Sequence, residues 1–280
     1  WEISLNWKHA LENGLSYNLG ISLYDYKSVV TKYFNPTGTL STWYEGAEVG
    51  DIWGYTVNDL FRSQEDLDSY LSKVDMTHIA ANWNTGDLKY EDINHDGKVN
   101  NGTNTIGNHG DLSVIGNDQP HYQYTINGGV SYKGFDFSML WRGVAKKDMY
   151  FYRGSNIYWG FMGGWWESCL TPEHLDYFRD QPGSKYSGLY EGDANINTDA
   201  YWPRPYLNNT EEAKNKNHAN TRYLQNAAYL RLQNVQLGYS FPRSIASKMH
   251  LEKLRIYFSG ENLLTFSKLP NGIDPVSYRR

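Results

Sequence analysis

Apolar and polar residues alternate along six segments of this chain, with the period of two that is typical of β-strands. In residues 121–133, for example, Tyr122 and Tyr124 alternate with Gln123 and Thr125. The pattern predicts strands at about 1–9, 15–27, 121–133, 134–146, 228–241 and 253–266. Each predicted strand therefore has one apolar face that is rich in aromatic residues and one polar face.

Short and long connections alternate between these strands. The segments at 9–14, 133–134 and 242–252 are short, whereas 28–120 and 147–227 are long. Outer-membrane barrels have this asymmetry, with short periplasmic turns and long extracellular loops. A tilted strand crosses a bilayer in about 9–11 residues. The pattern therefore predicts an all-β fold, part of an antiparallel transmembrane β-barrel, with extracellular loops at 28–120 and 147–227.

Local signals add detail to this prediction. The two leucines before Gln233 have the opposite parity to the rest of their strand, which predicts a β-bulge there. In the loops, Ser63 is placed to cap a short helix. Thr171 and Pro172 predict the start of a second helix that runs to about Arg179. The loops are therefore expected to contain ordered structure.

Composition narrows the class of protein. The chain has 280 residues, a net charge of -5 and a pI near 5.9, which argues against a nucleic-acid-binding protein. Its mean hydropathy of -0.67 excludes a helical membrane protein but is compatible with half-apolar barrel strands. Aromatic residues make up 16% of the chain. Because the chain starts at Trp1, we expect it to be a piece of a longer protein.

Several segments, taken in order, resemble blocks typical of SusC/RagA-type TonB-dependent transporters. They are 86–99 (GDLKYEDINHDGKV), 114–117 (VIGN) with the strand that ends at 131–136 (SYKGFD), 229–239 (YLRLQNVQLGY) and 259–266 (SGENLLTF). The resemblance implies about six late strands of a plugged barrel of about 22 strands. It also implies that 1–280 is the C-terminal part of the barrel domain, and that the plug domain and the final strand are not in this chain.

The resemblance also implies a function and a location. The protein would import a large nutrient across the outer membrane of a Gram-negative bacterium, driven by TonB through a segment outside this chain. A surface lipoprotein of the SusD type would act as the lid. The favoured cargo is an oligosaccharide, and the alternative is a peptide. The surrounding partner would be outer-membrane lipid, with no role for nucleic acid.

One loop motif suggests a metal site. The pattern from Asp92 to Gly97 matches the first half of an EF-hand calcium loop, in which Gly permits the sharp turn. Thr103 occupies the position of the usual bidentate Glu, so either the affinity for Ca2+ is weaker or another acid such as Asp111 must fold back. The alternative is a turn held by Asx side-chain hydrogen bonds. The candidate ligands are Asp92, Asn94, Asp96, the carbonyl of Lys98, and Asn100.

Aromatic rings beside amides and guanidinium groups suit sugars or peptides, and the loop at 147–227 contains such a set. The alternative is that these rings pack among the loops. The candidate ligand-binding residues are Tyr158, Trp159, Trp165, Trp166, Tyr201, Trp202 and Arg204. Candidate polar residues facing the barrel lumen are Asn18, Ser22, Asn127, Asp136, Arg142, Gln236, Arg255 and Glu261.

Catalysis has little support in the sequence. The histidines are scattered without a zinc-protease spacing, and there is no G-x-S-x-G or phosphate-binding glycine motif. We therefore predict no catalytic residues and no enzyme activity. Two other classes stay open at this point: a soluble carbohydrate-binding β-protein, which would bury the aromatic face as its core, and a secreted glycosidase, which needs two carboxylates across a sugar.

Overall fold

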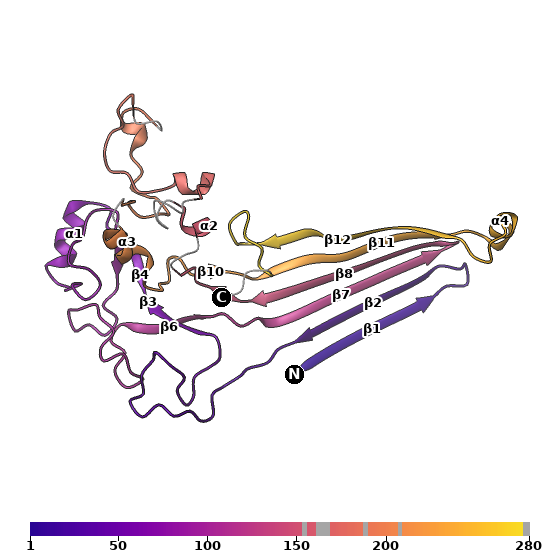
Figure 1. Cartoon of the computed structure of the whole chain (residues 1–280), viewed down its shortest axis with the longest axis horizontal. Helices are drawn as coiled ribbons and strands as arrows, with labels where there is room; N and C mark the ends of the chain where they lie inside the picture. The colour runs from indigo at the N-terminus through magenta and orange to yellow at the C-terminus, as the bar shows by residue number, and fades with distance from the viewer. Residues whose placement is uncertain (153–155, 161–168, 187–189, 207–208, 277–280) are drawn as a thin grey trace.

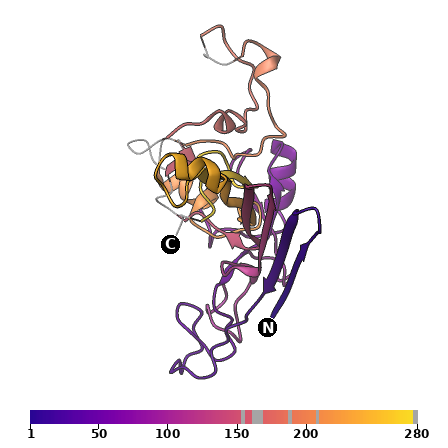
Figure 2. The same ribbon diagram turned by 90° about the vertical axis from the view of Figure 1, so that its right-hand side faces the viewer.

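A long antiparallel sheet and, at one of its ends, a folded unit made from the two long loops form the structure (Figure 1). This computed structural model describes residues 1–152, 156–160, 169–186, 190–206 and 209–276. Seen from the opposite end, the loop unit extends beyond the sheet both above and below it (Figure 2). In the described residues, no helix is both long and apolar enough to cross a membrane.

The sheet contains the six strands that the alternation predicts, and each begins and ends close to its predicted bounds. Neighbouring strands are antiparallel, and the order in the sheet is β1-β2-β7-β8-β11-β12. The chain therefore runs up and down as in a barrel wall. The strands are β1 (Glu2–Ala10), β2 (Ser16–Tyr24), β7 (His121–Tyr132), β8 (Phe135–Lys146), β11 (Tyr229–Ser240) and β12 (Arg255–Ser267).

The register aligns residues of one kind in rows across the sheet. One apolar row is Tyr17, Val130, Phe137, Leu237 and Phe258. A polar row on the other face is Asn18, Gly129, Ser138, Gln236 and Ser259. The apolar face stays uncovered, since Leu5 and Phe258 are 66% and 69% exposed. Within the described chain, this face is not the core of a sandwich.

Turns and irregularities of the sheet follow from local sequence. Lys133 and Gly134 connect β7 to β8 with φ values of +50° and +90°, the positive pair of a type I′ hairpin turn. The predicted bulge in β11 is confirmed by a register shift between Leu232 and Asn234 against both neighbouring strands. The connection from β11 to β12 contains a short helix, α4 (Arg243–Lys248), that the pattern did not predict.

Short strands and helices form the loop unit. The helix after Ser63 is confirmed, because the Asp66 backbone N–H donates to Ser63 Oγ over 3.2 Å. The predicted helix to Arg179 is wrong in length, because only a 3-10 turn forms and it ends before Asp176. The paired strands are β3 (Asp51–Tyr55) with β6 (Leu112–Asn117), β4 (Val57–Leu60) with β5 (Leu88–Tyr90), and β9 (Asp148–Met149) with β10 (Gln225–Asn226). The α-helices are α1 (Gln64–Leu71), α2 (Asn156–Trp159) and α3 (Asn209–Lys216), and the 3-10 turns are η2 (Pro172–Leu175) and η3 (Asp193–Asn195).

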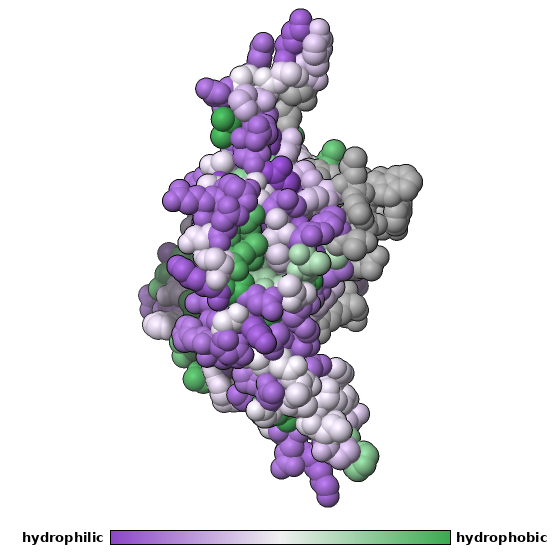
Figure 3. All heavy atoms as spheres, turned by 90° about the vertical axis from the view of Figure 1, so that its left-hand side faces the viewer, coloured by the Kyte–Doolittle hydropathy of each residue, from purple (hydrophilic) through white to green (hydrophobic). Residues whose placement is uncertain are grey.

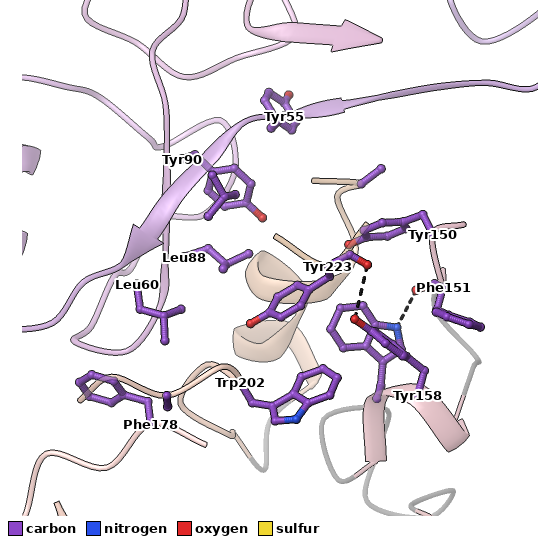
Figure 4. Close-up of a cluster of buried hydrophobic side chains, with 14 of the residues drawn as sticks. Tyr55, Leu60, Leu88, Tyr90, Tyr150, Phe151, Tyr158, Phe178, Trp202 and Tyr223 are labelled. Carbon is purple, nitrogen blue, oxygen red and sulfur yellow. Dashed lines mark hydrogen bonds between the residues drawn. The ribbon is translucent and has the colours of Figure 1, made fainter. Parts of the chain in front are cut away.

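The hydrophobic core of the described chain lies in the loop unit. Every member of its buried cluster comes from outside the six long strands, and large rings such as Tyr90 and Tyr223 are fully buried there (Figure 4). The outer surface at this end is mainly hydrophilic (Figure 3). The loops therefore fold as a water-soluble domain does, whereas the sheet presents its apolar face outward.

Candidate functional site

Three of the predicted ligand-binding rings are core residues of the loop unit. Tyr158, Trp159 and Trp202 are at most 3% exposed. Trp159 Nε1 donates to the Phe151 carbonyl over 2.6 Å. Burial of an aromatic side chain is a large source of stability. The arrangement favours the packing alternative for these three rings, and ligand binding through them stays a prediction.

Trp202 is covered on its ring faces as well as buried. His174 stacks on it with ring centroids 5.2 Å apart at 27°, and Tyr223 stacks at 5.5 Å and 17°. Of the other predicted rings, Tyr201 is 37% exposed. Trp165 and Trp166 lie outside the described residues. Trp202 therefore offers no open aromatic face to a sugar.

Arg204 connects two segments of the loop unit. Its guanidinium forms an ion pair with Asp180 and donates to the backbone carbonyl and the hydroxyl of Thr85. Hydrogen bonds from Thr85 and Arg204 lower the pKa of Asp180, against the opposing effect of burial, so the pair is ionised at neutral pH. In this structure Arg204 has a structural role, and its predicted contact with a ligand stays a prediction.

A cavity of about 340 Å³ opens beside the buried rings. Its floor is formed by Tyr158 and Trp202, and the half-exposed ring of Tyr201 lies at its edge. Three segments that are far apart in the sequence meet here: η2 with its flanks, β10, and the chain that follows β12. The remaining lining residues are Thr171, Glu173, His174, Asp176, Gln225, Lys268, Pro270 and Asn271.

His174 fixes the shape of this cavity from below. Its Nδ1 accepts from the Thr171 backbone N–H over 3.0 Å, so its Nε2 carries the proton and donates to the Tyr158 carbonyl over 2.8 Å. Both nitrogens of this buried ring are thus occupied by backbone groups. The residue acts as a brace between η2 and α2, and it is not placed as a proton-transfer group.

The rim of the cavity carries charged groups. Glu173 Oε1 accepts from Asn271 Nδ2 over 3.0 Å, and a hydrogen bond from Thr171 lowers the pKa of Glu173. Asp176 accepts from Asn197 and from the Tyr201 backbone N–H. Neither carboxylate has a Lys or Arg partner among the described residues, and the rim residue Lys268 likewise has no acidic partner there.

Sequence reasoning did not identify this rim. Glu173, Asp176 and Lys268 are separated by long stretches of chain and match no motif. Their proximity depends on how η2 and the end of β12 pack, which no local pattern encodes. The aromatic density around residues 158–202 pointed to the right loop but not to the charged groups.

The predicted calcium loop is closed by side-chain hydrogen bonds in the structure. Asp92 accepts from the backbone N–H groups of Asp96 and Gly97 over 3.2 and 2.8 Å. Asp96 in turn accepts from the Lys98 N–H over 2.9 Å, and Gly97 has the positive φ of +81° that the turn requires. The described residues contain no group of three or more His, Cys, Asp or Glu side chains arranged around a metal position. The loop thus has the geometry of the Asx-turn alternative, and metal binding stays a prediction.

The polar face of the sheet also brings predicted residues together. Arg255 forms an ion pair with Asp136 across β11 and donates to Gln236 Oε1 over 3.0 Å. Ser22 and Thr125 share a hydroxyl hydrogen bond on the same face. These contacts satisfy the groups within the sheet, so this face forms a polar, hydrogen-bonded surface.

Comparisons with known proteins agree with this architecture. No family model matches the chain. Two curated proteins of Formosa agariphila are similar: TonB-dependent receptor P3, 24% identical over 84% of this chain, and TonB-dependent receptor P26, 23% identical over 79%. The chain spans 19% of the length of each of these relatives.

Solved structures of a RagAB peptide transporter share the fold. One matches with a TM-score of 0.60 and 16% identity, covering 98% of this chain and 26% of that one. Two further structures, described as the open-open and closed-closed states of the RagAB peptide importer, match with TM-scores of 0.53 and 0.55, at 17% and 16% identity, covering 98% of this chain and 25% and 26% of theirs. The fold of the six-stranded sheet with its loop unit is thus also found in the RagAB peptide transporter.

Proposed function

We propose that this chain, which belongs to the SusC/RagA-type TonB-dependent transporters of the outer membrane, forms late barrel wall and extracellular loops of an importer for a large nutrient. The observation that carries the proposal is the contrast between its two parts. The sheet exposes apolar rows such as the one through Leu5 and Ile21, whereas the loops bury a core of their own. A lipid-facing wall with a folded entrance suits import of a cargo that must first be captured.

The partners follow from the same proposal. A SusD-like lipoprotein would close over the loop unit, whose outer surface is mainly hydrophilic (Figure 3). TonB would act through a segment outside this chain and supply energy from the inner membrane. Similarity to the RagAB structures, which have an open-open and a closed-closed state, supports a lid that opens and closes.

Two cargo classes remain in the proposal. The oligosaccharide is the cargo that the family resemblance implies, and the aromatic residues of the loop at 147–227 were expected to suit sugars or peptides. The burial of Tyr158, Trp159 and Trp202 weakens the case for a sugar, because a sugar stacks on an open ring face. The charged rim beside Glu173 and Lys268 favours a peptide, so we place the peptide first and the oligosaccharide second.

Deleting the gene of the full-length transporter from its source bacterium tests the proposal. We expect uptake of either fluorescently labelled peptides or labelled oligosaccharides to fall to the level of a strain without TonB, and to return when the gene is restored. Uptake of a monosaccharide that passes through porins is the control and should not change. Uptake of both labelled classes at the parental level would contradict an import function.

A further inference from the structure

The cavity beside Trp202 is lined by three charged side chains and by the amides of Gln225 and Asn271. Gln225 Nε2 already donates to the hydroxyls of Tyr158 and Tyr201 over 2.7 and 3.1 Å. One N–H of the Asn271 amide donates to Glu173 Oε1. The charged groups that can still bind a ligand are the carboxylates of Glu173 and Asp176, which keep acceptor capacity, and the ammonium of Lys268, which has no acidic partner in the described residues.

The groups that line the cavity are poorly suited to binding a sugar. Sugar recognition combines an open aromatic face with amide and carboxylate hydrogen bonds to hydroxyls. Here Trp202 is 3% exposed and stacks against His174 and Tyr223, and the amide nitrogens of Gln225 and Asn271 already donate within the protein. The floor is therefore an apolar surface without a sugar platform.

The same groups are well suited to the positively charged end of a peptide. Glu173 and Asp176 contribute two negative charges and Lys268 one positive charge, so the rim is net negative. A hydrogen bond from Thr171 helps to keep Glu173 ionised. The cavity volume of about 340 Å³ is at the lower end of the range of ligand sites, large enough for one or two amino-acid residues.

We propose that this cavity binds the positively charged end of a peptide cargo, with an ammonium group at Glu173 and Asp176 and an apolar side chain against the floor. The inference rests on the proposed import function and specifies a peptide as the cargo that binds at the loop unit. Lys268 lies on the same rim and disfavours a second positive charge, which sets a preference for one cationic group beside an apolar one.

The test uses the full-length transporter, purified in detergent, and three probes. The first is the peptide Gly-Phe-Gly-Ser-Gly with a free amino terminus, its one positive charge, and a fluorescein at its carboxyl end. The second is N-acetylated Glu-Phe-Gly-Ser-Gly with the same label, and the third is unlabelled maltoheptaose as a competitor. Fluorescence anisotropy should give the lower Kd for the cationic peptide, and maltoheptaose should not displace it.

Charge variants then locate the binding. Glu173→Gln keeps an oxygen for Asn271 but loses the charge, so the Kd of the cationic peptide should rise about threefold to fivefold. Lys268→Glu should lower that Kd by a similar factor and weaken the acidic peptide further. Glu191→Gln removes an exposed charge outside the lining and is the matched control, with no change expected.

Two results would overturn the inference. One is equal affinity of the cationic and acetylated acidic peptides for the parental protein. The other is an unchanged Kd in both Glu173→Gln and Lys268→Glu, which would mean that other parts of the transporter fill the cavity. TonB-dependent uptake is measured separately in cells, so normal uptake together with either result rejects the cavity and leaves the import function standing.

Discussion

At the scale of single residues, burial decides what an aromatic or charged side chain does, and the sequence does not encode burial directly. Trp202 and Trp159 have the composition of a ligand platform, yet they form the core of the loop unit. Both uses require the same residue types, so only the packing of distant segments distinguishes them. The charged rim at Glu173 was missed for the same reason, because its neighbour Lys268 comes from the far end of the chain.

Glu212 in α3 gives a prediction at this scale. It is 1% exposed, its Oε1 has no hydrogen-bond partner among the residues that the structure describes, and its Oε2 accepts from the Tyr206 backbone N–H over 2.8 Å. Burial raises the pKa of Glu212 to about 8, although Lys216 nearby opposes the shift. A raised pKa in the folded state means that the stability contributed by the neutral form is fully present below about pH 4.5 and is lost as pH rises through about 8.

Glu212→Gln should remove this pH dependence, because the amide stays neutral and still accepts from Tyr206. Hydrogen exchange of the α3 amides in the full-length transporter measures it. At pH 9 the variant should exchange more slowly than the parental protein, and at pH 4, below the pKa of the exposed side chain, the two should be alike. Glu65→Gln in the exposed first turn of α1 is the control. A parental protein that is as well protected as the variant at pH 9 would contradict a buried, neutral Glu212.

At the scale of elements, strands were predictable and loop elements were not. The alternation in residues 121–133 and the turn at Lys133 and Gly134 are local properties, and they define β7 and β8 without knowledge of the rest of the chain. The bulge before Asn234 was visible as a parity change for the same reason. The helix expected after Pro172 is instead one 3-10 turn, because His174 is bound to Tyr158 and the chain then pairs with the segment at Trp202.

The loop from Asp92 to Asn100 carries a prediction at this scale. We propose that it binds Ca2+ weakly, because carboxylates that accept backbone N–H groups keep free lone pairs and Thr103 replaces the bidentate Glu. Calorimetric titration of the full-length transporter should give a Kd of about 10⁻⁴ to 10⁻³ M. Asp96→Asn, which keeps the acceptor for the Lys98 N–H, should abolish the heat.

Asp193→Asn is the matched control for this titration, since Asp193 is an exposed acid of the loop unit far from this motif in the sequence. It should leave the calcium affinity unchanged. No heat with the parental protein, or the same heat with Asp96→Asn, would leave the Asx turn as the sole role of these side chains.

At the scale of the whole molecule, the sheet has the residue distribution expected of a structure in contact with lipid, and the loop unit has that of a structure in water. The sheet has apolar residues outward and polar residues on its other face, whereas the loop unit has the opposite arrangement with its apolar cluster inside. The two faces of the sheet can be predicted from the sequence, because period-two alternation gives each strand one apolar and one polar face. The core of the loop unit cannot be predicted in this way, because it joins residues from both long loops, such as Tyr90 and Tyr223, and no single segment shows that pairing.

A charge placed on the lipid face tests this division. Ile21 lies near the middle of β2, is 41% exposed, and pairs with Leu5 and Ile126 in an apolar row. Ile21→Arg should lower the free energy of unfolding of the full-length barrel in lipid vesicles by about 2–4 kcal/mol, the cost of Arg at the bilayer midplane. Asn18→Arg places the same charge on the polar face of the same strand and should cost far less. Urea titration followed by heat-modifiable migration measures both, and equal losses would mean that the two faces do not meet different solvents.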